Sequence, residues 1–275
     1  LDSELVIPRE DSKRALMTML YGSSKVPEEV FDMNVGLFYE TVEEECNGAY
    51  TLLQILLDSW DKKALHHSWY LPDGHYAHCP TMQTKEKRIN LSEWGYTPVA
   101  TVKENTTLKF GLSNAANAIH SIDAYVLRTM VRRCNYKPKL IKQARQALID
   151  SIDEYNPNNV LNKRYEYTKM ADITHLDIIT NTANELDKEL KDKLIHIFDM
   201  VLSHVPFDVI CIHDSFGTHP NHCNQLRFHY KEILAELSES TVIDDILSQL
   251  FNYRDTVDKG DSIAEYIRNS NYGLS

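Results

Sequence analysis

Several features that would place a protein in a broad class are missing from this 275-residue sequence. No apolar run approaches the roughly 20 residues that a membrane-spanning helix needs, and the first residues lack the charged-then-apolar pattern of a secretory signal. Neither a low-complexity linker nor an internal repeat is present. We therefore expect a soluble globular protein that has no membrane partner.

Positive charge is also scarce, because 29 lysine and arginine residues face 40 aspartate and glutamate residues, for a net charge of −11. This is the wrong sign for a chain that grips nucleic acid over its whole surface, so any such contact must be local. One candidate phosphate-contacting patch has seven basic residues and no acidic one between Asp123 and Asp150. Charge alone is equally compatible with a solvated helix face. The seven are Arg128, Arg132, Arg133, Lys137, Lys139, Lys142 and Arg145.

The cysteines are few and do not suggest a disulfide framework. There are five, an odd number at scattered positions, which predicts a reducing and therefore cytoplasmic setting, that of the host cell if the chain is viral. Residue 1 is Leu instead of Met, which indicates a trimmed product or one piece of a longer chain.

The hydrophobic pattern predicts an α+β fold that is mostly helical and contains a few antiparallel strands. Expected helices share an apolar periodicity and cover residues 8–21, 26–45, 47–66, 113–133, 140–155, about 186–201, and 221 to the end. Expected strands lie near residues 69–71, 75–77, 97–102 and 209–212. We divide the chain into four parts at residues 1–66, 67–134, 135–203 and 204–275.

The first predicted helix carries a spacing that suits a nucleotide. Arg9 and Lys13 are four residues apart and can address the same anion, and Tyr21-Gly22 follows eight residues later, about 12 Å along the axis. That span fits a nucleoside triphosphate, with its phosphates at the cations and its sugar and base near the ring. Taken alone, the spacing favours two solvated cations and a core tyrosine.

A second segment, Val209 to Thr218, reads as a buried strand that ends in His213-Asp214 and turns at Gly217. A carboxylate at the end of a buried strand is costly unless it serves a cation or a proton. For an isolated Asp-Ser pair, the commoner role is to cap a turn.

Four segments together resemble the single-subunit RNA polymerases of bacteriophages and mitochondria, in the order that the family has them. They are Arg9 to Gly22, Trp69-Tyr70-Leu71-Pro72-Asp73-Gly74, Asn117-Ala118-Ile119-His120-Ser121-Ile122-Asp123 and His213-Asp214-Ser215-Phe216-Gly217-Thr218. The resemblance spans residues 9 to 218, but about 70 residues between Cys134 and His204 have no counterpart in it. It implies the fingers and palm of a right-hand polymerase, with a small antiparallel palm sheet.

The resemblance also implies a role for each matching residue. Arg9 and Lys13 would hold the incoming triphosphate, while Tyr21, next to Gly22, would face the ribose and base. His120 would approach the ribose or the minor-groove side of the new base pair. Catalytic roles would fall to Lys13, to Asp214 as a Mg²⁺ ligand and to His213 at the primer end. A two-metal site stabilises the attacking and leaving oxygens of nucleotidyl transfer.

The chain departs from the family in ways that imply a partner. The family's first catalytic Asp lies upstream of the Arg9 helix, where this chain has only eight residues, and the family's aromatic-terminated tail is absent. The second carboxylate of the metal site would come from another chain. The sequence is therefore most like the smaller subunit of a split, heterodimeric phage RNA polymerase that uses a DNA template and ribonucleoside triphosphates to make RNA.

Three alternatives stay open at this point. A DNA polymerase of the related family shares the first spacing but usually has Glu where this chain has Ser215. A polymerase-derived subunit that only mediates interactions is a second. A zinc protein is a third, although the histidine and cysteine clusters lack the usual paired spacing. Those clusters are His66, His67, His75, His78 and Cys79, and His213, His219, His222 and Cys223.

Overall fold

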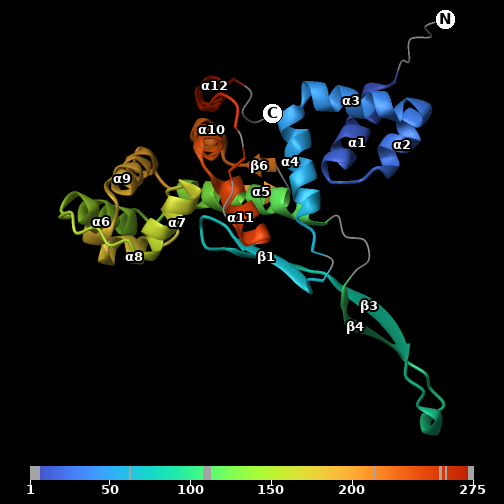
Figure 1. The fold of residues 1–275 in the computed structure, drawn as a ribbon. Helices are drawn as coiled ribbons and strands as arrows, with labels where there is room; N and C mark the ends of the chain where they lie inside the picture. Colours follow the sequence, from blue (N-terminus) through green and yellow to red (C-terminus); the bar gives the residue numbers. More distant parts are fainter. Residues whose placement is uncertain are drawn as a thin grey trace, which may run out of the picture. The chain divides into compact units, whose positions relative to one another are not determined.

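The computed structural model describes residues 7–61, 63–107, 113–212, 215–253, 256–257 and 259–271 (Figure 1). The chain forms two compact units, which are described separately. The first unit comprises Leu1–Trp69 and Ala77–Ile119, and the second comprises Tyr70–Tyr76 and His120–Ser275. Helices dominate, and the strands form small two-stranded pairs, which confirms the predicted α+β, mostly helical fold class. No helix among the described residues is both long and apolar enough to cross a membrane.

The first unit begins with helices, which are α1 (Arg9–Leu20), α2 (Lys25–Phe31), the 3₁₀ turn η1 (Asp32–Asn34), α3 (Val35–Glu45) and α4 (Asn47–Asp58). Pro8 precedes α1, where its missing N–H costs nothing, and Gly22 follows the helix with φ +87°, a conformation that favours glycine. Each helix buries one apolar face. The buried residues include Ala15, Met19, Phe38, Val42, Leu53 and Leu56.

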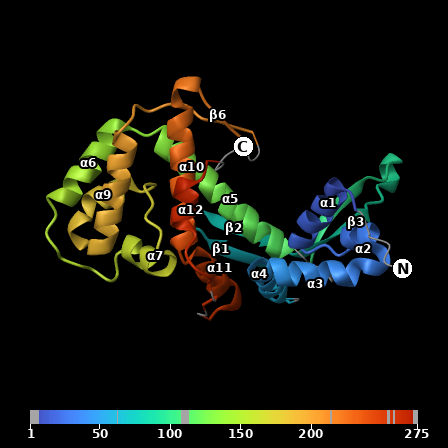
Figure 2. The same ribbon diagram turned by 90° about the horizontal axis from the view of Figure 1, so that it is seen from above.

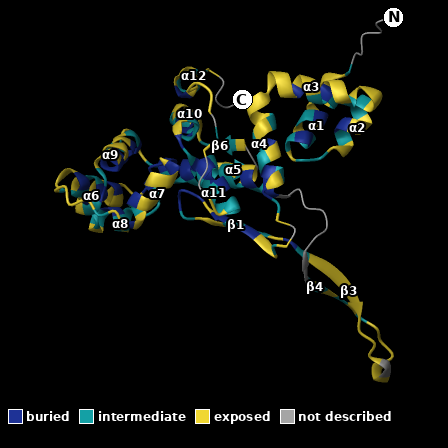
Figure 3. Ribbon diagram, in the orientation of Figure 1, coloured by how far each residue is buried: buried dark blue, intermediate teal, exposed yellow. Residues whose placement is uncertain are grey.

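Two strand pairs follow. β1 (His66–Tyr70) pairs with β2 (Tyr76–Pro80), and β3 (Met82–Arg88) pairs antiparallel with β4 (Val99–Thr107), with the turn η2 (Ser92–Trp94) between them. The residues of β3 after Met82 are all exposed (Figure 3). β4 was predicted, in part, but β3 was not, because its polar run shows no alternation of apolar and polar residues.

The second unit is built on α5 (Ser113–Cys134), which runs into it from the first unit. The following elements are α6 (Pro138–Ile149), α7 (Val160–Thr168), α8 (Leu176–Asn181), η3 (Ala183–Glu185), α9 (Lys188–Leu202), β5 (Ile210–Ile212), β6 (Ser215–Gly217), η4 (Pro220–His222), α10 (Cys223–Glu239), α11 (Val242–Phe251) and α12 (Ala264–Asn269). α6 and α9 lie side by side in both views (Figure 2).

The second unit contains two hydrophobic clusters. One lies among α6 to α9 and includes Ile141, Ile179, Leu194 and Phe198, all nearly inaccessible to solvent. The other joins α5 to α10 and to the segment before β5, through residues such as Met130, Phe207 and Ile233. The helices of residues 135–203 therefore have a core of their own. The four-part division drawn from the sequence stays a prediction.

Candidate functional site

Helix α1 places Arg9 and Lys13 on one exposed face. The side chain of Arg9 is 86% exposed, and Tyr21, at the C-cap, is 41% exposed. Arg9 and Lys13 are four residues apart and lie within about 40° of each other around the helix, whereas Tyr21, at the C-cap, lies about 120° around from Arg9. The helix buries Ala15 and Met19. The two cations are thus exposed side by side and Tyr21 is not in the core, while the ligand-facing role of these residues stays a prediction.

The same two cations also line a groove of about 740 Å³ between α1 and α3. Its remaining lining is largely apolar and includes Leu16, Phe31 and Phe38. Water screens a cation beside an apolar groove less than it screens a fully solvated cation, so the attraction of the cation to an anionic ligand is stronger. The position of Arg9 and Lys13 is therefore suitable for an anionic ligand that also has an apolar part.

Gly22 ends α1 directly after Tyr21. Its N–H donates to the Met19 carbonyl at 2.7 Å and closes the end of α1. At φ +87° a side chain would be strained, so glycine lets the chain leave the helix directly after Tyr21. We therefore assign Gly22 a structural part in the first motif.

The second motif forms a tight turn between β1 and β2. The Gly74 N–H donates to the Leu71 carbonyl at 2.8 Å, and the Leu71 N–H donates to the His75 carbonyl at 2.9 Å. Pro72 pre-sets the first bend, and Gly74 adopts φ +77°. The predicted strand-turn-strand reading of this motif is confirmed. Its Asp73 is buried, with a side chain that is 1% exposed.

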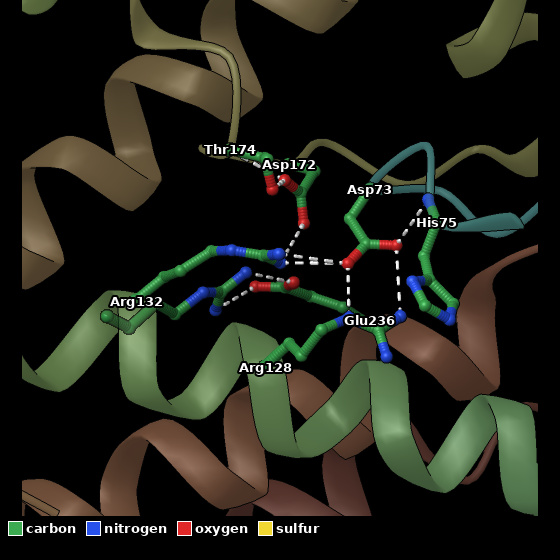
Figure 4. Close-up of polar contacts among 8 residues, drawn as sticks. Asp73, His75, Arg128, Arg132, Asp172, Thr174 and Glu236 are labelled. Carbon is green, nitrogen blue, oxygen red and sulfur yellow. Dashed lines mark hydrogen bonds and ion pairs between the residues drawn. The ribbon is translucent and has the colours of Figure 1, made fainter.

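Asp73 binds two arginines of α5 (Figure 4). Arg128 donates through Nε at 2.6 Å and Nη2 at 3.1 Å, and Arg132 donates through Nη1 and Nη2, both at 3.0 Å. Burial alone would raise the pKa of the Asp73 carboxyl, but the hydrogen bonds and charges of Arg128 and Arg132 outweigh it and lower the pKa. The second motif is thus joined by a charged, hydrogen-bonded contact to α5, the helix on which the third motif lies.

His120 lies on α5 about two turns before Arg128, and its side chain is exposed. The contact of Arg128 and Arg132 with Asp73 fixes the helix that carries His120. His120 belongs to the second unit, whereas Arg9, Lys13 and Tyr21 belong to the first. The structure does not establish a shared site for the two sets.

The fourth motif forms the β5–β6 hairpin, in which Ile212 pairs with Ser215. His213 and Asp214 connect these partners in the sequence and lie outside the described residues. Phe216 packs against the cluster between α5 and α10, while Ile210 and Ile212 are each 64% exposed. The hairpin borders a groove of about 840 Å³ with Phe207, Asp208 and His222. A hairpin is present, but the prediction of a buried strand that turns at Gly217 is wrong, because Ile210 and Ile212 are exposed and Gly217 lies in β6, where it pairs with Ile210. The metal role of Asp214 stays a prediction.

The basic segment of α5 and α6 is largely engaged within the protein. Arg128 and Arg132 bind Asp73, Arg133 binds Glu236 at 2.6 Å, and Arg145 binds Asp199 at 2.5 Å. The interpretation of all seven basic residues as a phosphate-contacting patch is therefore wrong for Arg133, whose side chain is 1% exposed, and it stays a prediction for the other six. Lys137, Lys139 and Lys142 are exposed on α6 and before it.

Metal ligands do not gather within the described part of the chain. No three His, Cys, Asp or Glu side chains there are grouped so that they could hold a metal ion. His66 and His78 face each other across β1 and β2 with ring centroids 4.9 Å apart, without a third ligand grouped with them among the described residues. The Mg²⁺ site, with Asp214 as one ligand and a second carboxylate from a partner chain, stays a prediction.

Sequence reasoning missed the acidic residues that organise the second unit. Asp73 was found as part of a motif, but Asp172 and Glu236, which also meet the arginines of α5, were not. The single available signal was the run of arginines without nearby acids, since buried guanidinium groups need carboxylates from distant segments.

The chain was compared with protein-family models and with curated proteins, and neither comparison found a match.

Proposed function

We propose that this protein is the fingers-and-palm subunit of a Mg²⁺-dependent, DNA-templated RNA polymerase whose remaining part is a separate chain. The observation that carries the proposal is the pair of cations Arg9 and Lys13, one turn apart on α1, at a largely apolar groove, with Tyr21 exposed at the end of the same helix. Two neighbouring cations can address one triphosphate, and the apolar surface beside them suits the remainder of a nucleotide.

Two further features support the proposal. The Pro72-Asp73-Gly74 turn is bound through Asp73 to Arg128 and Arg132 of α5, the helix that also carries His120. Ile212 pairs with Ser215 in the β5–β6 hairpin, so His213 and Asp214 link the two strands in the sequence.

The proposed roles follow from the chemistry of the side chains. Arg9 and Lys13 bind the triphosphate through charge-assisted hydrogen bonds, and Tyr21 packs on the ribose and base. His120 contacts the ribose side of the new base pair. Asp214 is the ligand that this chain gives to Mg²⁺, with His213 beside it, and the partner chain gives the second carboxylate. The bound metal ions supply charge stabilisation for nucleotidyl transfer.

The first experiment is to determine the native mass of the protein as isolated from its source and to identify each co-purifying chain. We expect a one-to-one complex with a second polypeptide that carries the missing aspartate. A lone monomer of 31.8 kDa would overturn the proposal of a split enzyme.

The second experiment is primer extension by the reconstituted complex on a DNA template with Mg²⁺. We expect incorporation of ribonucleotides in preference to deoxynucleotides, and loss of synthesis in Asp214→Asn with subunit assembly intact. Asp208→Asn is the matched control, because Asp208 is an exposed carboxylate in the same segment, and it should retain synthesis. A preference for deoxynucleotides would instead support the DNA polymerase alternative.

A further inference from the structure

The helical segment 135–203 is the part of the chain for which the four motifs give no role. Hydrogen bonds join the two ends of this segment. The Phe207 N–H donates to the Cys134 carbonyl at 3.0 Å, the Tyr136 hydroxyl donates to the His204 carbonyl, and the Asn135 amide donates to Asp208 Oδ1 at 2.8 Å. With adjoining ends and its own hydrophobic cluster, the segment has the form of a domain inserted between α5 and β5. We call residues 135–203 the inserted module.

The inserted module touches the Pro72-Asp73-Gly74 turn directly. Pro72 shares a cavity of about 20 Å³ with Leu161, Arg164 and Asp172, all residues of the module. A space of this size holds at most one water molecule, so these groups form a close packing contact and leave no room for a ligand. The guanidinium of Arg164 lies so near the turn that a Cβ on Gly74 would be 2.9 Å from its Nη1.

The module also contributes a carboxylate to the arginines at this contact. Arg128 and Arg132 together bring two positive charges to Asp73, which supplies one negative charge. The second comes from Asp172, whose Oδ2 lies 4.0 Å from Arg132 Nη1 (Figure 4). The side chain of Asp172 is 7% exposed, and the Thr174 N–H holds its Oδ1 at 2.7 Å. Asp172 Oδ2 is buried and makes no hydrogen bond with the described residues, so the ion pair with Arg132 offsets part of the cost of burying this carboxylate.

We propose that the inserted module is a brace for the Pro72-Asp73-Gly74 turn and for α5, and that Asp172 and Arg164 are its positioning residues. Asp172 acts through Arg132, which it holds against Asp73, and Arg164 acts by closing over the turn at Gly74. This role depends on contacts within the second unit alone and does not require the polymerase proposal.

The test is amide hydrogen exchange of the full-length protein, read separately for the turn (residues 70–76) and for the module core (residues 190–201). The turn has amides with defined acceptors, those of Leu71, Gly74 and His75. We expect Asp172→Asn to speed exchange of the turn at least tenfold while the module core is unchanged. Asp177→Asn, the same substitution at an exposed position of α8, should leave both regions unchanged.

Two further variants separate positioning from general destabilisation. Asp172→Glu keeps the charge and should restore most of the protection of the turn. In an Arg132→Met background, Asp172→Asn should have no further effect on the turn, because its proposed target is gone. If Asp172→Asn does not fold, Arg164→Met is measured in the same way, with the same expected local effect.

Unchanged exchange of the turn in Asp172→Asn or Arg164→Met would overturn the brace. An equal acceleration of the turn and of the module core would overturn it as well, because that result indicates a general loss of stability. Either outcome leaves the extension assay unaffected, so a failure here is distinguishable from a failure of the proposed polymerase function.

Discussion

Arg133 and Glu236 form a bidentate ion pair inside the second unit, with Nη1–Oε1 at 2.8 Å and Nη2–Oε2 at 2.6 Å. The side chain of Arg133 is 1% exposed and that of Glu236 is 20% exposed. Burial by itself would lower the pKa of the guanidinium, but the charge and hydrogen bonds of Glu236 raise it. The pair connects α5 to α10 and keeps the arginine charged at every accessible pH.

Removal of the Glu236 carboxylate should therefore destabilise the folded protein. We expect Glu236→Gln to lower the free energy of unfolding by about 3 kcal/mol or more, because it leaves a buried cation without its carboxylate. The double variant Arg133→Met/Glu236→Leu should recover much of that loss, since no charge then stays buried. Urea unfolding of the three proteins measures both effects, and equal loss in the single and double variants would contradict the argument.

His229 should make the protein sensitive to acid. It is fully buried, its Nε2 lies 2.7 Å from His204 Nε2, and burial, followed by the charges of Arg133 and His204, lowers its pKa to about 3. The unfolded chain binds a proton at this residue near pH 6.5, whereas the folded chain does not, so stability falls as the pH drops below that value.

Between pH 7.5 and pH 5 we expect His229 to account for a loss of about 2 kcal/mol of unfolding free energy. Urea midpoints at the two pH values should differ less in His229→Gln than in the parent protein. His196→Gln, an exposed histidine of α9, is the control and should behave like the parent. An acid dependence in His229→Gln equal to the parent's would refute the assignment.

Lys13 should contribute to nucleotide binding in the reconstituted enzyme. We expect Lys13→Met to lower kcat/KM for ribonucleoside triphosphates by at least tenfold, because a charge-assisted hydrogen bond to phosphate contributes about 1.5–3 kcal/mol. Lys25→Met is the control, since Lys25 is an exposed lysine of α2 whose partner is Glu29 at 3.9 Å. Equal effects of the two substitutions would argue against a nucleotide at α1.

Asp73 should stabilise the second unit through its two arginines. Asp73→Asn is expected to cost about 3 kcal/mol, compared with at most about 0.5 kcal/mol for the exposed Asp192→Asn. Because the folded pKa of Asp73 is lowered, its stabilising contribution is present above the unfolded pKa of about 3.9 and is lost as the pH falls through the folded value. The variant should therefore unfold with a weaker dependence on pH in that acidic range, as followed by circular dichroism.

Local signals were sufficient to predict several elements of the fold. Pro8 and Gly22 bound α1 because their backbone restrictions act within a few residues, and Pro72-Asp73-Gly74 specifies its turn in the same way. A helix was also expected to extend to about Tyr155, but α6 ends at Ile149. The following segment bonds instead to distant groups, with Ile152 and Glu154 donating to Asn184, and such competition has no local signature.

In the candidate site, too, features set by neighbouring residues could be predicted, whereas contacts between distant segments could not. Residue types and spacing predicted the helix that carries Arg9 and Lys13 and a strand before His213, because both depend on short-range geometry. The burial of that strand and its turn at Gly217 were predicted wrongly, because they depend on packing and pairing with other residues. The contact of Asp73 with Arg128 joins residues 55 positions apart and depends on how α5 packs. Periodicity within either segment contains no information about that pairing.

The exposed connection between β3 and β4 has a practical consequence for experiments on this protein. Of the three tryptophans in the sequence, Trp94 is 83% exposed in this connection, whereas Trp69 is 1% exposed. An aqueous quencher such as iodide therefore reaches Trp94 and does not reach Trp69. Any macromolecule that covers the end of this hairpin will shield one quenchable component of the emission, so the protein carries an optical reporter that needs no added label.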